Sequence, residues 1–402
     1  MKARSQFDEI VHRRGSGSYK WDSEAEVDVI PLWVADMDFR TAPVVIEALR
    51  RRVEHGVFGY TLVPPRYYEA LTGWFASRHN YVIDSQRVIY TSGVVPAISA
   101  IIKALVKPGE GVIVQTPVYN CFFSSIRNNG CRIVENPLLR NGLPDNEFTY
   151  SMDYDGLERL AADPTNTMLL LCNPHNPAGR AWTAEELLRV ADICRRNGVR
   201  VVSDEIHCEL TRPGLGYVPY ANAEAMSAQD GPGAVVCLSP SKAFNTAGLQ
   251  IANIVCPDEE TQRLIDKAIN INEVCDVNPF GVEGLMAAYT PEGAAWLDEL
   301  RAYIFDNYTF VRDYVRRELP MCPMTRLEAT YLPWLDVSAF GIPSEEMEER
   351  LLHEAKVWVN CGEMYGAGGY LRLNIACPRS VLAEGLHRMT RRLKAQILDS
   401  NA

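Results

Sequence analysis

The 402-residue chain lacks the basic clusters with which nucleic-acid-binding proteins neutralise phosphates. Its formal net charge is −11, and its densest basic runs, RRGSGSYK and RRRVEH, are short. No apolar run approaches the roughly 18 residues that a membrane-spanning helix needs. The segment MKARSQFDEIVHRRGSG has no apolar stretch either, so we expect no signal peptide. These absences disfavour nucleic acid and membrane as partners.

The chain also lacks paired cysteines, because its 11 cysteines include no CxxC spacing and their number is odd. Structural zinc sites need paired spacings, and disulfide frameworks use an even number of cysteines. We therefore expect reduced thiols, no metal site and a cytoplasmic location. With 47% apolar and 23% charged residues, the composition is that of a soluble globular enzyme.

Seven short apolar runs, each closed by Gly, Pro, Ser or Asn, lie between residues 88 and 257. They are VIYTSG, GVIVQTP, CRIVENP, TMLLLCNP, VRVVSDEI, GAVVCLSPS and QIANIVCP. Helical patterns separate several of them: one begins at Pro96, and another has a capping box, Thr183 with Glu186, and Gly198 as its stop. This alternation predicts an α/β domain with a mostly parallel seven-stranded sheet.

The pattern changes after about residue 290. A long helical pattern comes first, and its apolar stripe comprises Leu300, Ile304, Tyr308, Val311 and Val315. The strand-like runs YLPWLDV, VWVNC and YLRLNIA follow, with the helical SEEMEERLLHEA among them and a final helix after them. We predict a large domain over 46–289, a smaller α+β domain over 290–402, and an N-terminal arm over 1–45 that joins the small domain.

Polar or aromatic residues follow five of the seven predicted strands. Ligands of open α/β sheets bind at the carboxyl ends of the strands, so these side chains are expected to converge. Gly93 and Val94 either turn the chain or present N–H groups to a phosphate at a helix N-terminus. Tyr119 suits a core position or a stacking face, and Asn176 suits a turn or a ligand contact.

Three charged residues are candidates for chemistry. Asp204 closes an apolar strand, where an unpaired charge is costly. Lys242, in SPSKAFNTAG, has small and apolar neighbours and either reaches solvent or is buried for a purpose. Arg372 lies opposite the apolar face of LRLNIA, either at the surface or as a carboxylate anchor.

Together these residues match the needs of pyridoxal phosphate and an amino-acid substrate. The cofactor requires a lysine for its Schiff base and an acid against its pyridine nitrogen. Its phosphate requires N–H and hydroxyl donors, and its ring a stacking face. The substrate α-carboxylate requires a guanidinium, which can bind it through two hydrogen bonds.

The motifs NPHNPAG, SDEIH and SPSKAFNTAG resemble those of the aspartate-aminotransferase-like, fold-type I pyridoxal-phosphate enzymes. Within that superfamily, PLWVADMDF, HGVFGYT, TSGVVPAI, TYLPWLD and YLRLNIACPR are similar to the cystathionine β-lyase, or C–S lyase, branch. The resemblance extends over nearly the whole chain. It implies the fold-type I architecture, with the cofactor bound by the large domain.

The resemblance also implies a role for each matching residue. Lys242 would form the Schiff base, Asp204 would pair with the pyridine nitrogen, and Asn176 would donate to the phenolic oxygen. Tyr119 would stack on the ring. Arg372 would bind the substrate carboxylate, and Asn176 and Tyr60 would also contact the substrate. The implied phosphate ligands are Gly93, Val94, Ser239, Ser241 and the partner's Tyr60, which implies a homodimer with shared sites.

Two positions depart from the pattern of many aminotransferases of this fold. Gln250 replaces an arginine that binds the phosphate, which removes a charge-assisted hydrogen bond worth about 1.5–3 kcal/mol. His207 replaces a tyrosine beside the phenolic oxygen, so the sequence does not determine whether this oxygen has a second hydrogen bond. Both departures favour the lyase branch.

The function implied is β-elimination from L-cystathionine or a related cysteine S-conjugate, giving thiol, pyruvate and ammonia, in methionine biosynthesis. Lys242 would act as the base at Cα, for which burial must lower its pKa. Two alternatives stay open: an aminotransferase of class I/II, and a regulatory protein that retains the cofactor but acts through a partner. The sequence does not determine whether Trp33, Met37 or Tyr365 shapes the distal pocket.

Overall fold

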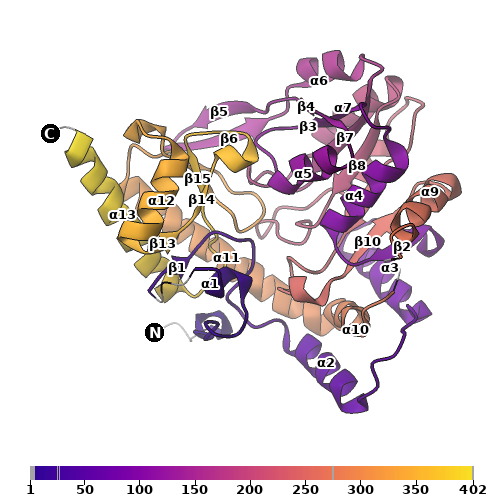
Figure 1. Ribbon diagram of the computed structural model, residues 1–402, viewed down its shortest axis with the longest axis horizontal. Helices are drawn as coiled ribbons and strands as arrows, with labels where there is room; N and C mark the ends of the chain where they lie inside the picture. The colour runs from indigo at the N-terminus through magenta and orange to yellow at the C-terminus, as the bar shows by residue number, and fades with distance from the viewer. Residues whose placement is uncertain (1–4, 25, 27, 274–275, 401–402) are drawn as a thin grey trace.

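The computed structural model describes residues 5–24, 26, 28–273 and 276–400. Figure 1 shows two regions side by side, a large sheet covered by helices and a second region that contains most of the C-terminal third of the chain. Within the described residues, no helix combines the length and the apolar character that a membrane crossing requires.

The seven predicted runs form one seven-stranded sheet. Its spatial order is β2 (Val88–Thr91), β10 (Ala252–Val255), β9 (Val235–Leu238), β8 (Arg200–Asp204), β7 (Asn166–Cys172), β3 (Gly111–Val114) and β4 (Arg132–Glu135). Neighbours from β9 to β4 are parallel, and β10 is antiparallel to both β2 and β9. Asp204 pairs with Cys172 on one side and Cys237 on the other, so the three strands end within one residue of each other. The mostly parallel sheet is confirmed.

Helices cover both faces of this sheet, which explains why its central strands are almost continuously apolar. One face packs against α4 (Val94–Leu105), α5 (Asn120–Asn128) and α9 (Glu259–Asn270). The other packs against α6 (Tyr154–Ala161), α7 (Ala184–Arg196) and α8 (Tyr220–Glu224). The remaining helices of this region, α2 (Pro43–His55), α3 (Pro65–His79) and α10 (Pro279–Ala288), contribute to a third core.

The predicted helix signals are present. The Thr183 hydroxyl accepts a hydrogen bond from the Glu186 N–H at 3.2 Å, and the Glu186 carboxylate accepts one from the Thr183 N–H at 2.8 Å. Gly198, just beyond α7, has a φ of +71°, a conformation that glycine adopts without strain. Helix α4 begins two residues before the expected start, so Pro96 lies within its first turn.

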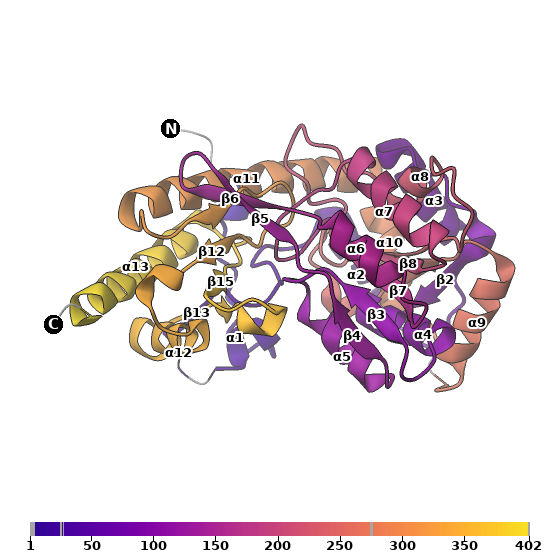
Figure 2. The same ribbon diagram turned by 90° about the horizontal axis from the view of Figure 1, so that it is seen from above.

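The second sheet contains a hairpin that the sequence analysis did not predict. Its order is β14 (Asn360–Cys361), β15 (Tyr370–Arg372), β12 (Trp334–Asp336), β11 (Met324–Thr325), β6 (Glu147–Ser151) and β5 (Leu139–Leu143). The hairpin β5–β6 comes from the middle of the chain and joins the C-terminal strands through β6 and β11. Around this sheet lie α11 (Pro291–Glu318), whose predicted apolar stripe is buried, α12 (Ser344–Ala355) and α13 (Arg379–Ser400), as Figure 2 shows.

The N-terminal arm contains α1 (Tyr19–Asp22) and β1 (Ile30–Pro31), which pairs in parallel with β13 (Val357–Trp358). Beyond β1, residues 33–39 run along the large region, and we call them the strap. An ion cluster fixes the strap: the buried Lys20 ammonium lies 2.8 Å from the Asp38 carboxylate, and Arg13 pairs with both Asp36 and Asp38. Buried charges are tolerated when they are paired in this way.

Candidate active site

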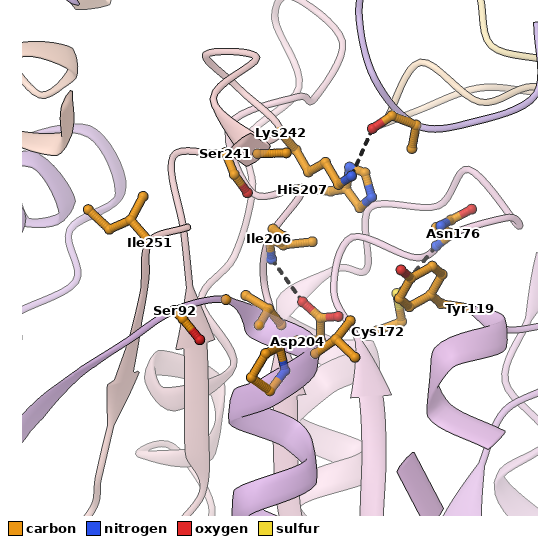
Figure 3. A pocket seen from close by; sticks show the side chains of 16 residues that line it. Ser92, Tyr119, Cys172, Asn176, Asp204, Ile206, His207, Ser241, Lys242 and Ile251 are labelled. Carbon is orange, nitrogen blue, oxygen red and sulfur yellow. Dashed lines mark hydrogen bonds between the residues drawn. The ribbon is translucent and has the colours of Figure 1, made fainter. Parts of the chain in front are cut away.

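One cavity lies at the carboxyl ends of β2, β3, β7, β8 and β9, and Figure 3 shows its side chains converging. The lining includes eight of the residues singled out in the sequence: Gly93, Val94, Tyr119, Asn176, Asp204, His207, Ser241 and Lys242. The expected convergence at the sheet rim therefore places a lysine, a carboxylate and a helix N-terminus around one space.

Lys242 follows β9, and its amine points into the cavity. Its Nζ donates a hydrogen bond to the Ala35 carbonyl of the strap at 2.7 Å, the bond drawn from Lys242 in Figure 3. Burial lowers the pKa of this amine below its ordinary value; the Asp36 carboxylate opposes that shift and the Arg372 guanidinium adds to it. Lys242 is thus a neutral base at a lower pH than an exposed lysine.

Asp204 is the last residue of β8 and is only 3% exposed. Burial raises its pKa to about 6, although a hydrogen bond from the Ile206 N–H at 3.1 Å and the charge of Lys242 oppose the rise. In the described part of the chain no cationic side chain is hydrogen-bonded to this carboxylate. A protonated pyridine nitrogen would supply the missing cationic donor, so this position fits pyridoxal phosphate.

An anion site lies where Gly93 begins α4. The N–H groups of Val94 and Val95 belong to the first turn and have no partner within the helix, and the helix dipole there favours negative charge. The Ser241 side chain also lines the cavity. Ser239 does not: its hydroxyl lies 2.9 Å from that of Ser241 and 2.6 Å from the Ile251 carbonyl, so it supports Ser241 from behind. Neutral donors at a helix N-terminus fit a phosphate.

Arg372 is buried at 3% exposure, so it is not the surface arginine that its strand pattern also allowed. Its Nη1 donates to the Asn176 side-chain oxygen at 3.2 Å, and its Nη2 donates to the Trp33 carbonyl at 2.8 Å. The guanidinium lies over the Tyr365 ring, 4.7 Å from its centroid. These contacts orient the guanidinium beside Asn176, where a substrate carboxylate can bind.

His207 and Tyr119 are both neutral in this environment. Burial lowers the pKa of His207 to about 3, and the charges of Lys242 and Arg372 act in the same direction. Its Nδ1 has no hydrogen-bond partner among the described residues. Burial raises the pKa of the Tyr119 phenol well above its ordinary value. A neutral imidazole and a neutral phenol can each donate or accept without adding charge.

Tyr60 and Gln250 lie at the surface, and Ser239 and Arg372 lie beside the cavity without lining it. Tyr60 is 96% exposed and outside the cavity of its own chain. Gln250 is exposed, has a φ of +53°, and does not line the cavity.

The main-chain contribution of Ala35 was not predicted. A main-chain carbonyl contact does not depend on the type of side chain, so the sequence does not reveal it. Only the motif PLWVADMDF drew attention to this segment. Ile206 and Cys172 also line the cavity and were not singled out. They are apolar positions of the strand ends and could have been inferred from their closeness to Asp204 and Asn176.

The chain belongs to the aminotransferase class I and II family, whose sequence profile matches residues 27–389. Its fold is therefore the fold-type I pyridoxal-phosphate transferase fold.

Among individual proteins, it is similar to the cystathionine beta-lyase PatB of Bacillus subtilis, with 39% identity over 95% of this chain and 98% of that protein. Cystalysin from Treponema denticola, whose crystal structure contains pyridoxal 5'-phosphate, has a TM-score of 0.91 and 33% identity, covering 97% of this chain and 98% of that one. The pyridoxal-phosphate-bound C–S lyase from Staphylococcus hominis has a TM-score of 0.87 and 31% identity, covering 96% and 98% respectively.

Proposed function

We propose that this protein is a pyridoxal-phosphate-dependent carbon–sulfur β-lyase acting on L-cystathionine or a related cysteine S-conjugate. The observation that carries the proposal is the placement of Lys242 and Asp204 in one cavity, with the Arg372 guanidinium beside it. The similarity to proteins named as cystathionine β-lyase and C–S lyase selects this reaction from those that the family performs.

The residues around the cavity would divide the binding of the cofactor among them. Lys242 would hold it through its amine nitrogen, Asp204 would face the ring nitrogen, and Tyr119 would stack on the ring. Asn176 would donate to the phenolic oxygen. The phosphate would lie at the start of α4, against the N–H groups of Val94 and Val95 and the Ser241 hydroxyl.

When bound, pyridoxal phosphate supplies an electron sink that stabilises negative charge at the substrate Cα. Arg372 binds the substrate carboxylate and so fixes the orientation of the Cα–H bond. The free amine of Lys242 takes the proton from Cα, a role that its lowered pKa favours. Loss of a thiolate from Cβ, followed by addition of water and release of ammonia, gives one thiol and one pyruvate per substrate consumed.

The test is to supply the holoenzyme with L-cystathionine and no 2-oxoacid. We expect pyruvate, thiol and ammonia to form in equal amounts, and L-alanine, which has no leaving group on Cβ, to give no pyruvate under the same conditions. If turnover instead requires a 2-oxoacid and yields a new amino acid, the enzyme is an aminotransferase. That second candidate is favoured by the class I and II family itself.

We also propose a homodimer in which the partner's Tyr60 reaches the phosphate. In support, Tyr60 lies on a strongly exposed apolar segment with Val57, Phe58 and Leu62, which a second copy would cover. Sedimentation of the holoenzyme should then give twice the mass of one chain.

Mixed dimers provide a sharper prediction for the same residue. Tyr60→Ala and Lys242→Ala chains, each weakly active alone, should regain activity when unfolded and refolded together. Each hybrid dimer has one site with Lys242 from one chain and Tyr60 from the other, so random pairing gives roughly a quarter of the wild-type activity. Activity equal to the mean of the two parents would show that the sites are not shared.

The cellular setting is a further part of the proposal. With cystathionine as substrate, the thiol product is homocysteine, which places the reaction in methionine biosynthesis. A cytoplasmic location is supported by the ten described cysteines, all of which are free thiols. The eleventh, Cys275, lies outside the described residues.

A further inference from the structure

Two side chains only three residues apart in the sequence, Lys242 and Asn245, bind the strap. Lys242 donates to the Ala35 carbonyl at 2.7 Å. Asn245 accepts from the Met37 N–H at 3.0 Å and donates to the Met37 and Phe39 carbonyls, each at 2.9 Å. The same short segment therefore contains the reactive amine and an amide that binds the strap.

Asn245 adopts a φ of +53°, in the left-handed region that asparagine tolerates better than most residues. The positive φ and the three hydrogen bonds mean that this side chain forms a specific junction with the strap rather than a surface contact. No part of the mechanism above uses it.

The opposite edge of the strap is fixed by the second sheet region and the arm. The Asn374 side chain donates to the Val34 carbonyl at 2.5 Å and to the Asp36 carbonyl at 2.8 Å. Lys20 donates to the same Asp36 carbonyl at 2.9 Å. The strap is therefore held from both sides, and Asn245 is the side chain that joins it to the segment of Lys242.

We propose that Asn245 is a positioning residue: it sets the Ala35 carbonyl, which in turn holds the amine of Lys242 whenever that amine is not covalently engaged. Its effect on turnover rests on the lyase function proposed above. One N–H fixed by a carbonyl defines where the nitrogen lies and restricts the direction of its lone pair. A displacement of about 1 Å in such a group can cost roughly a hundredfold in rate.

The role proposed for Asn245 should affect kcat and KM differently. Arg372 is held by Asn176 and by the Trp33 carbonyl, which lies at the other end of the strap from Met37 and Phe39, the residues that Asn245 binds. Loss of Asn245 should therefore slow proton transfer at Cα, which lowers kcat, while binding of the substrate carboxylate and hence KM change little. A purely structural role would alter both parameters.

The test uses Asn245→Gly, because glycine keeps the positive φ and removes all three bonds. The matched control is Asn146→Gly, in the β5–β6 turn, where asparagine has a φ of +60°. We expect kcat to fall about 10–100-fold in the first variant, with KM within about twofold, and no change in the control.

A second measurement does not depend on turnover. Acetic anhydride labels amines of the full-length chain after the cofactor has been removed, and mass spectrometry reports each lysine. In Asn245→Gly, Lys242 should be acetylated at least about threefold faster than in wild type, because its amine is released from Ala35, while the exposed Lys103 serves as an unchanged reference.

If Asn245→Gly does not fold, Asn245→Asp retains the acceptor for the Met37 N–H and loses the two donated bonds, and the same two measurements apply. Wild-type acetylation of Lys242 together with wild-type kcat in either variant overturns the proposal, as does a parallel change in kcat and KM. If the wild-type enzyme releases no pyruvate, the lyase function fails, whereas the acetylation rates still decide the role of Asn245.

Discussion

A Lys242→Ala variant is expected to release pyruvate from L-cystathionine at least 10²–10⁴-fold more slowly than the wild type, because it loses the base at Cα. Loss of the covalent tether to the cofactor lowers the rate further. The measurement is pyruvate release by saturating substrate, with cofactor at a concentration that fills the site of both proteins. The position of the amine in the cavity is the structural reason for so large an effect.

Lys103→Ala is the appropriate control, because Lys103 is an exposed lysine on α4 whose loss leaves the cavity unchanged. Near-wild-type pyruvate release by Lys242→Ala would contradict the assignment of the base. A variant with no turnover but an intact effect in the cell would instead support the alternative of a regulatory protein.

An Asp204→Asn variant is expected to lose about 10²–10³-fold in kcat for the lyase reaction. A neutral amide cannot stabilise a proton on the ring nitrogen, so the electron sink is weakened while the shape of the site is preserved. The measurement is again pyruvate release at full cofactor occupancy. A loss smaller than about threefold would show that Asp204 does not pair with the ring nitrogen.

The Asp204→Asn variant without cofactor should be more stable to unfolding than the cofactor-free wild type at high pH, but not at low pH. The pKa of Asp204 rises from 3.8 unfolded to about 6 folded, which corresponds to about 3 kcal/mol. The folded chain binds the extra proton, so its stability is highest at low pH and falls as pH rises through about 6. Removing the charge should therefore raise the free energy of unfolding at pH 8, with a gain that shrinks towards pH 4.

Denaturant unfolding of the cofactor-free proteins at pH 8 and pH 5 measures this gain. Asp298→Asn serves as a control of opposite sign. Although partial burial raises the pKa of Asp298, its bonds with Arg78 and Arg301 leave that pKa below its ordinary value. Its ionised form therefore stabilises the fold, and the amide should be less stable at both pH values.

The large sheet could be predicted because its central strands are buried on both faces and their sequences are apolar runs. The β5–β6 hairpin could not, since β5 is almost wholly exposed and RNG interrupts it, leaving no apolar or alternating signal. The pairing of β6 with β11, far along the chain, joins the hairpin to the second sheet. The predicted large domain over 46–289 includes this hairpin, because its contact with β11 joins residues that lie far apart in the sequence.

In the candidate site, too, some residues could be predicted from the sequence and others could not. Lys242 and Asp204 were predictable because a charged residue at the end of a buried strand is costly without a partner. Arg372 was ambiguous, since alternation along a strand cannot distinguish a solvent-facing side from one covered by a strap and the Tyr365 ring. Ala35 acts through its main chain, and Tyr60 would act only in a second copy, so neither contact is encoded within one local stretch.

The mixed origin of the second sheet has a consequence for how this protein emerges from the ribosome. The β5–β6 hairpin is translated well before β11, its neighbour in the sheet, so one edge of β6 stays open while the middle of the chain is synthesised. An unpaired strand edge invites pairing with other chains. We therefore expect nascent chains that end before β11 to be prone to aggregation, and that edge to need shielding until the last quarter of the chain arrives.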